Sequence, residues 1–270
     1  MIVTRIGTPA LVSFGDGQVH SVFHSSCNIR LSEGPLMCLH QFSYGVLPYS
    51  LYVPDLDTQL FYPGQPVHVS AGEIVVNQQY FIPIADDVEV VDTRITLGVL
   101  PQSCDTEWEM LRQVRESKLC EDSLLQQVYD DLADALENLH HALLSGRQEE
   151  LAQHCQACIG YGQGLTPSGD DMLLGTFAAL HGFAPQLVPS LAEVMSPLLD
   201  RTNEISRSYL TLAMEGYAAT PVLEVLRCLG SGQTQPAETL LSVGHASGSD
   251  ILYGILTTVK KLWDKEKGRK

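Results

Sequence analysis

The residues best suited to chemistry belong to a short element that occurs twice. Ser168-Gly-Asp-Asp-Met-Leu-Leu-Gly175 and Ser247-Gly-Ser-Asp-Ile-Leu-Tyr-Gly254 share Ser, Gly, Asp, Leu and Gly at equivalent places. Each copy follows a polar or glycine-rich loop and leads into an apolar run with helical spacing. This pattern favours an internal duplication, with the two copies related by a pseudo-two-fold axis.

Helix capping alone would explain part of the pattern. Ser168 and Asp171 have the spacing of a capping box, in which Ser is the N-cap and the carboxylate reaches back to its amide, and so do Ser247 and Asp250. Acids in a first turn also complement the helix dipole. Capping therefore accounts for the Ser and Asp residues but not for the glycines.

The glycines suggest a close approach. Gly175 and Gly254 are expected inside helices, where glycine costs about 1 kcal/mol relative to alanine. Contact with another backbone or a ligand would offset that cost. Each glycine lies four residues after the Asp of its copy and so on the same helical face. If the helices cross there, Asp171 and Asp250 share one pocket at the two N-termini.

The loop before the first copy has the composition of an anion site. Gly160–Gly164 supplies backbone amides that can cradle an anion, although Asp170 and Asp171 would repel a phosphate. The acids act either as bases or orienting groups toward a neutral amide substrate, or they hold a divalent ion that meets the anion. His245 is a candidate acid or base, with a local turn contact as the equal alternative.

The first 103 residues are expected to form the β elements of the chain. Short runs rich in Val, Ile, Tyr and Phe alternate with turn signals such as Gly15-Asp16-Gly17. The pattern predicts four successive strands in the second half of this region: Pro66–Val69, Glu73–Val76, Gln79–Pro83 and Val88–Asp92. A compact sandwich or a barrel-like unit is the expected result.

Helical spacing begins after Pro101. Apolar residues recur every three or four positions from Thr106 to about Leu144, and helical texture persists to the C-terminus. We therefore predict an α+β chain, with a β-rich domain over 1–105 and a mostly α-helical domain over 106–270 that carries the repeated elements.

Composition narrows the expected environment and partners. The net charge of −16 argues against nucleic acid or an anionic membrane as partner. Six of the sixteen Lys and Arg residues lie in the last eleven positions, so few cations remain for an anionic ligand elsewhere. The seven scattered cysteines indicate a reducing, cytoplasmic setting, and the lone Cys155-x-x-Cys158 pair is expected to be structural rather than zinc-binding. No signal peptide or membrane-spanning run is expected.

Several strings around the repeated elements form a series of motifs. The string Gly162-x-Gly-Leu-Thr-Pro-Ser-Gly-Asp-Asp-x-Leu is similar to the signature of the AllH family. Three later strings follow in the family's order: Thr202-x-x-Ile-Ser-x-Ser-Tyr-Leu, Gly216-Tyr-x-Ala-x-Pro221 and Gly244-His-x-Ser-Gly-x-Asp. A weaker match covers Asn28 to about Val53. The specific part of the resemblance runs from Gly160 to Gly254.

The resemblance implies an oxamate carbamoyltransferase subunit that acts with FdrA- and AllG-like partners in allantoin and purine breakdown. That enzyme converts oxalurate and phosphate to oxamate and carbamoyl phosphate, or the reverse. The chemistry needs oxyanion donors and a group that manages the amide proton, and a charge from Arg207 or Arg201 would suit a carboxylate. The expected catalytic residues are Asp170, Asp171, His245 and Asp250, and the expected substrate-binding residues are Gly162, Gly164, Thr166, Ser168, Gly169, Ser206, Ser247 and Gly248.

Two other functions compete with this hypothesis. One is a divalent-metal-dependent hydrolase that uses Asp170, Asp171 and Asp250, although no cofactor is required by the sequence. The other is a non-catalytic subunit of a multi-protein enzyme whose loop only binds a small ligand or a partner. An ordinary surface ion pair is the alternative explanation for Arg207.

Overall fold

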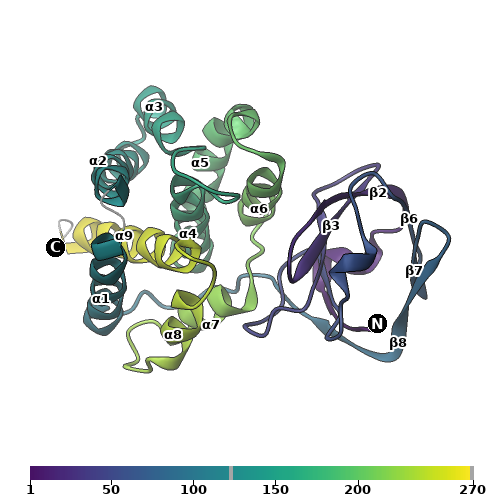
Figure 1. Cartoon of the computed structure of the whole chain (residues 1–270). Coiled ribbons are helices and arrows are strands. Elements are labelled where there is room, and N and C mark those ends of the chain that lie inside the picture. The colour runs from purple at the N-terminus through teal and green to yellow at the C-terminus, as the bar shows by residue number, and fades with distance from the viewer. Residues whose placement is uncertain (122–123, 268–270) are drawn as a thin grey trace. The chain divides into compact units, whose positions relative to one another are not determined.

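The computed structural model describes the backbone of residues 1–121 and 124–267. It describes the side chains of residues 1–118 and 126–267. The chain forms two compact units: Met1–Arg94 with Tyr217–Thr220, and Ile95–Gly216 with Pro221–Lys270. The first unit is a β-barrel and the second is helical (Figure 1), which confirms the predicted α+β fold class.

The first unit is a closed barrel, which decides between the two architectures expected from the sequence. Neighbouring strands follow the order β1-β5-β4-β3-β2-β6-β7-β8, and β8 pairs with β1 in parallel to close the sheet. Closure leaves no unpaired sheet edge. In the described residues the strands are β1 (Val3–Gly7), β2 (Gly15–Val22), β3 (Ser26–Leu31), β4 (Met37–His40), β5 (Ser50–Tyr52), β6 (Pro66–Val69), β7 (Glu73–Val76) and β8 (Tyr80–Val91).

The predicted strands match the barrel with two differences. Strands β6 and β7 have the predicted bounds, but the last two predicted strands form one continuous strand, β8. Its first residues pair with β7, and the residues from Ile84 onward pair with β1. The turn predicted at Gly15-Asp16-Gly17 is also wrong, because the three residues lie in β2 and pair with β6, and Gly17 also pairs with β3.

The second unit packs nine α-helices within the described residues. They are α1 (Asp105–Glu121), α2 (Leu124–Ser145), α3 (Gln148–Cys158), α4 (Ser168–Phe183), α5 (Val188–Met195), α6 (Glu204–Met214), α7 (Thr220–Cys228), α8 (Gln235–Leu241) and α9 (Ser247–Lys267). The predicted helical run from Thr106 to Leu144 corresponds to α1 and α2. None of the described helices is long and apolar enough to cross a bilayer.

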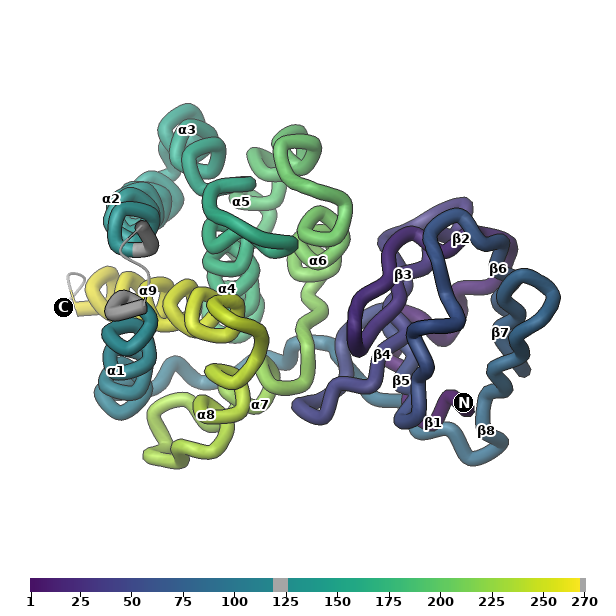
Figure 2. The backbone as a smooth tube through the Cα atoms, in the orientation of Figure 1, coloured from purple at the N-terminus to yellow at the C-terminus, as the bar shows by residue number. Residues whose placement is uncertain are grey.

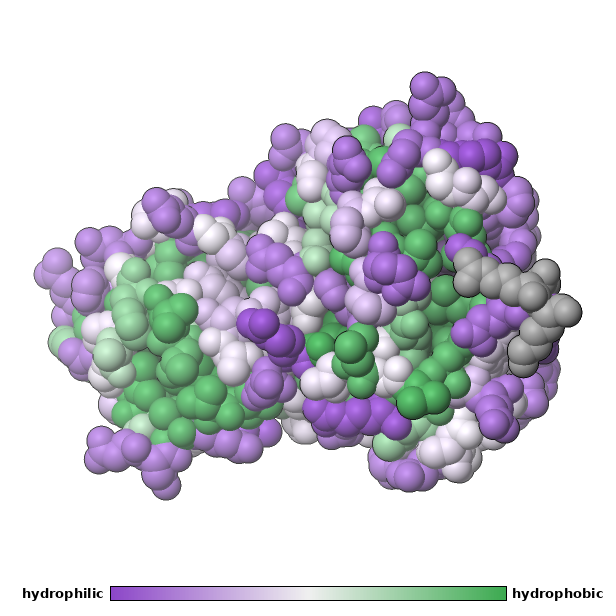
Figure 3. Space-filling model, turned by 180° about the vertical axis from the view of Figure 1, so that it is seen from behind, coloured by the Kyte–Doolittle hydropathy of each residue, from purple (hydrophilic) through white to green (hydrophobic). Residues whose placement is uncertain are grey.

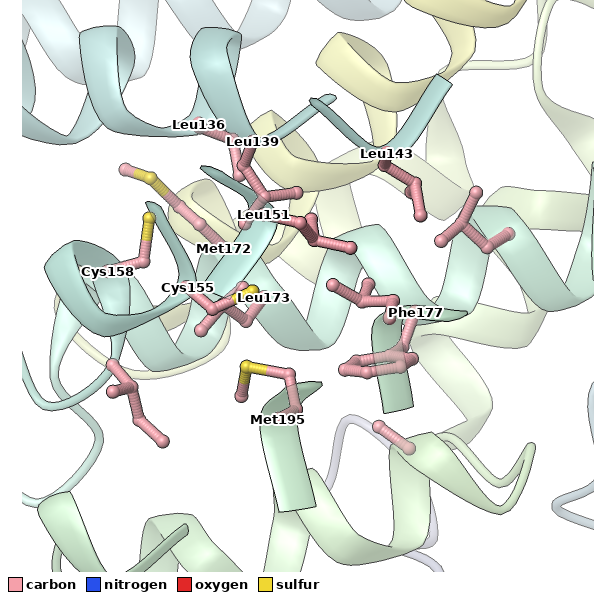
Figure 4. Close-up of a cluster of buried hydrophobic side chains, with 14 of the residues drawn as sticks. Leu136, Leu139, Leu143, Leu151, Cys155, Cys158, Met172, Leu173, Phe177 and Met195 are labelled. Atoms are coloured by element: carbon pink, nitrogen blue, oxygen red, sulfur yellow. The ribbon is translucent and has the colours of Figure 1, made fainter. Parts of the chain in front are cut away.

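The helical core forms around α4. Helices α2, α3 and α5 bring buried apolar side chains onto it, as Figure 4 shows for Leu139, Leu151, Leu173, Phe177 and Met195. Cys155 and Cys158 are buried in the same cluster as free thiols, and burial raises the pKa of Cys158 to about 12. These contacts fit the structural role expected for the two cysteines.

Helices α4 and α9 cross at the predicted glycines. A Cβ atom added to Gly175 would lie 2.1 Å from the carbonyl oxygen of Ile251, and one added to Gly254 would lie 2.1 Å from that of Met172. Ile251 and Met172 occupy the same place in the two copies, so each copy's glycine packs on the equivalent residue of the other. The two helices lie side by side in Figure 2. This reciprocal contact is what a pseudo-two-fold axis produces, and it confirms the predicted crossing.

Candidate active site

The first turns of α4 and α9 carry most of the candidate residues. Helix α4 begins at Ser168 after Pro167, and no side chain caps its N-terminus. The capping box predicted for Ser168 and Asp171 is therefore wrong. The Asp171 carboxyl instead interacts with the hydroxyls of Ser247 and Thr166, because the crossing places the start of α9 next to it.

The first Ser of each copy interacts with the Asp carboxyl of the other copy. Thr166 Oγ1 and Ser247 Oγ are 2.8 Å apart, and both interact with Asp171. Ser168, at the start of α4, interacts with Asp250 of α9. The two carboxyls are buried, with 4% of Asp171 and none of Asp250 exposed, in one polar cluster.

The two acids have raised pKa values but different neighbours. Burial is the main reason why the pKa of Asp171 lies well above its usual range, and the charge of Asp250 raises it further. Burial also raises the pKa of Asp250, but Arg115 opposes this effect, and its Nη2 donates to Asp250 Oδ1 at 3.0 Å. The pair thus favours a proton on Asp171 and a negative charge on Asp250.

Each of the two acids has one buried carboxyl oxygen without a hydrogen-bond partner among the described residues. Asp171 Oδ2 and Asp250 Oδ2 are buried and accept no hydrogen bond from the described residues. Buried polar atoms in folded proteins almost always have a partner, in the protein or in bound water. These two oxygens are therefore candidate acceptors for a ligand or an ordered water.

Asp170 is surrounded by donors instead. Its Oδ1 accepts from the Gly160 amide at 2.7 Å, and its Oδ2 accepts from the hydroxyls of Thr202 at 2.5 Å and Ser206 at 2.6 Å. These contacts fasten α4 to the loop after α3 and to the segment that starts α6. The catalytic role expected for Asp170 and the binding role expected for Ser206 stay predictions, but the contacts favour a structural role for both.

The glycine loop partly fits the expected anion cradle. The Gly160 amide is not free, since it donates to Asp170. Gly162 and Gly164 have φ values of +117° and +93°, and their amides donate none of the backbone hydrogen bonds found among the described residues. Nothing lies within 4 Å of a Cβ added to Gly164. These two amides remain available to an anionic ligand.

Gly169 and Gly248 have a packing reason for being glycine. A Cβ added to Gly169 would lie 1.9 Å from the Cys158 carbonyl oxygen, and one added to Gly248 would lie 1.8 Å from that of Leu240. Each glycine thus lets the preceding helix end directly against the new helix. This contact explains the Ser-Gly start of each copy without a ligand.

Two residues singled out in the sequence, His245 and Arg207, lie outside the first turns of α4 and α9. His245 is exposed in the loop before α9 and makes none of the side-chain hydrogen bonds found in residues 1–118 and 126–267. Arg207 Nη1 forms an ion pair with Asp200 at 3.0 Å, the alternative that the sequence left open. The cation that meets the acid pair is Arg115 instead.

The three acids do not form a recognisable metal site. Within the described residues, no group of three or more His, Cys, Asp or Glu side chains is arranged to hold a metal ion. Asp170 uses both oxygens for hydrogen bonds to N–H and O–H donors, and Asp250 uses one for Arg115. N–H and O–H groups thus surround these acids, an arrangement that suits proton transfer better than the binding of a metal ion.

Three residues of the site escaped sequence reasoning because they lie on other helices or at an unmatched position of the repeat. Arg115 of α1 lies between the rings of Tyr129 (4.2 Å from its centroid) and Tyr253 (4.0 Å). One signal was available: Arg115 follows the buried Leu111 by four residues, so it lies on the apolar face of α1. An arginine on such a face needs a buried partner, which here is Asp250.

Family models match the chain in two segments. The model described as the AllH family N-terminal domain matches residues 4–89, which is most of the barrel. The model described as oxamate carbamoyltransferase subunit AllH matches residues 158–259, from the end of α3 into α9. The chain belongs to the AllH family. The second AllH match contains both copies of the repeated element and the whole glycine loop, whereas Arg115 and Tyr129 lie between the two matches. No solved structure matches the chain significantly.

Proposed function

We propose that this chain is the AllH subunit of an oxamate carbamoyltransferase, with Asp171 and Asp250 as the groups that move the proton. The observation that carries the proposal is the buried pair of acids at two adjoining helix starts, one beside Arg115 and the other without a cation. The pair lies inside the segment matched by the AllH model.

The reaction needs one proton taken and one proton given. When phosphate attacks the ureido carbon of oxalurate, a C–O bond forms and the bond from that carbon to the oxamate nitrogen breaks. Phosphate loses a proton, and the departing nitrogen gains one. Asp250, held as a carboxylate by Arg115, accepts the first proton, and Asp171 donates the second. A proton passed from Asp250 to Asp171 restores the pair.

The charge of the site suits this chemistry better than the sequence suggested. A phosphate near two consecutive acids would be repelled, but a protonated Asp171 carries no charge and Asp170 is surrounded by three donors. The N-termini of α4 and α9 and the free amides of Gly162 and Gly164 then favour an anion. The same amides are the candidate donors for the oxyanion that forms at the attacked carbon.

We further propose that the chain acts together with FdrA- and AllG-like proteins in the cytoplasm. The matched family is named as a subunit, which supports a multi-protein enzyme. The barrel unit also exposes large apolar side chains, and one face of it shows a broad hydrophobic area in Figure 3. Exposed apolar areas of this kind are typical of protein–protein contacts.

The test is a carbamoyl-transfer assay with carbamoyl phosphate and oxamate as substrates. We expect oxalurate and phosphate to form in equal amounts when the chain is combined with FdrA- and AllG-like partners, and not when the chain is left out. Transfer that is equally fast without the chain would contradict the proposal. Substrate binding by the chain without any contribution to turnover would favour a non-catalytic subunit.

A further inference from the structure

We propose that the groove between α1, α2 and α9 binds a small planar carboxylate, with Arg115 as its anchor. The groove has a volume of about 860 Å³ and is lined by Arg115 together with four aromatic residues, Trp108, Tyr129, Tyr253 and Trp263. The inference rests on the proposed function in one respect: oxamate and oxalurate belong to this ligand class.

Arg115 is held in place with most of its donors unused. Its guanidinium lies between the Tyr129 and Tyr253 rings, and 13% of its side chain is exposed. Of its five N–H groups, only one on Nη2 makes a hydrogen bond within the described residues, to Asp250. The buried Nε has no partner there. A guanidinium fixed by two rings loses little freedom when it binds a carboxylate through two parallel hydrogen bonds.

The walls of the groove select for shape. The Trp108 ring meets the Tyr253 ring edge to face at 5.9 Å between centroids, so the aromatic surface extends away from Arg115 along α1. Flat aromatic faces favour a planar ligand over a tetrahedral one. Oxamate is planar and carries one carboxylate beside an amide.

Charges of both signs line the groove. The acids are Asp105, Glu109, Glu116, Asp130 and Asp264, and the cations are Arg112, Arg115, Lys260 and Lys267. Arg112 is paired with Glu109 and Glu116, and the two lysines are exposed. Arg115 is the one of these four cations that is largely buried, so it is the cation that suits a single carboxylate.

The tryptophans of the groove can report ligand binding by their fluorescence. The chain contains two tryptophans, Trp108 and Trp263, and both line the groove. A tryptophan fluorescence titration of the full chain with oxamate therefore reads binding at this place. We expect a saturable change with oxamate and at least tenfold weaker binding of oxamide, which has the same planar shape but no carboxylate.

Two substitutions distinguish a specific role of Arg115 from a general effect of positive charge in the groove. Arg115→Gln should weaken oxamate binding at least about tenfold, as expected for lost hydrogen bonds to a charged group. Arg112→Gln, which removes the same charge from the same groove, should leave the Kd within about twofold. If Arg115→Gln does not fold because Asp250 loses its partner, Arg115→Gln combined with Asp250→Asn removes both charges, and Asp250→Asn alone is its reference.

Three results would overturn the proposal: no saturable change with oxamate, equal affinity for oxamide, or equal affinity in the Arg115→Gln protein. Because the titration needs no turnover, it can succeed while the carbamoyl-transfer assay fails. A groove that does not bind oxamate would in turn leave the acid pair to be tested by that assay.

Discussion

At the scale of single residues, two equivalent acids have been given unlike surroundings. Asp171 and Asp250 occupy the same place in the two copies and both have raised pKa values. Only Asp250 has Arg115 beside it. Equal copies would share the proton between them, whereas Arg115 lowers the pKa of Asp250 alone and so favours the proton on Asp171 and the charge on Asp250.

The raised pKa of Asp171 predicts a pH-dependent stability. A carboxyl whose pKa is higher in the folded than in the unfolded chain stabilises the fold fully below the ordinary value of 3.8, and this contribution is lost as the pH rises through the folded pKa. Relative to Asp171→Asn, the wild type should therefore lose free energy of unfolding, by about 1.4 kcal/mol per pH unit at most, as the pH rises from about 4.

Urea unfolding of both proteins across pH 4 to 8 measures this difference. Asp134 of α2 is exposed to solvent and supplies the control. The Asp134→Asn protein should show the same pH dependence as the wild type. Parallel pH profiles of the wild type and Asp171→Asn would contradict the raised pKa.

Asp170 should matter for stability above all. Asp170→Ala removes the acceptor of three hydrogen bonds and leaves their donors buried, so we expect a loss of about 3 kcal/mol or more in the free energy of unfolding. Asp200→Ala, at an exposed ion pair nearby in the chain, should change it by less than about 1 kcal/mol. Similar values for the two variants in chemical denaturation would refute the structural role.

Residue types and spacing predicted part of this site. Asp171, Asp250 and the hydroxyls of Ser168 and Ser247 were found because they recur in a repeated element. Arg115 was not, since its contact with Asp250 joins α1 to α9 and depends on packing that no local spacing records. Asp170 was also found, but its hydrogen bonds could not be predicted, because their donors come from the loop after α3 and from the segment that starts α6.

At the scale of elements, the site depends on the crossing of α4 and α9. The glycines let each backbone reach the other, and this approach brings the hydroxyls of one helix start to the carboxyl of the other. The crossing could be predicted from glycines at equivalent positions inside two helical patterns. The closed barrel could not, because turn signals mark where strands end but not which strand closes the sheet.

The crossing predicts a specific effect of alanine. Gly175→Ala or Gly254→Ala would place a methyl group 2.1 Å from a carbonyl oxygen, so the helices must separate. We expect each substitution to lower the free energy of unfolding by about 2–4 kcal/mol. Gly182→Ala in α4 is the matched control, because its added Cβ would have its nearest neighbour at 3.9 Å. It should be neutral or stabilise by up to about 1 kcal/mol. Equal effects of Gly175→Ala and Gly182→Ala would rule out a tight crossing.

At the scale of the whole molecule, strong negative charge coexists with a proposed anion-binding function. The net charge of −16 leaves few cations, and the helical unit places one of them, Arg115, directly at the acid pair. The α+β class and the AllH family were both predicted from sequence, since strand and helix texture and a specific glycine motif are local signals. The division into domains at residue 105 stays a prediction; the first residue of α1 lies there.

The most direct test of the acid pair is carbamoyl transfer by the reconstituted enzyme with one acid replaced at a time. Asp171→Asn and Asp250→Asn should each lower kcat/KM at least about 100-fold while the chain stays folded, because each removes one of the two proton-transfer steps. The exposed Asp134→Asn should retain wild-type turnover. Turnover within a few-fold of the wild type in both Asp171→Asn and Asp250→Asn would contradict a catalytic role for the pair.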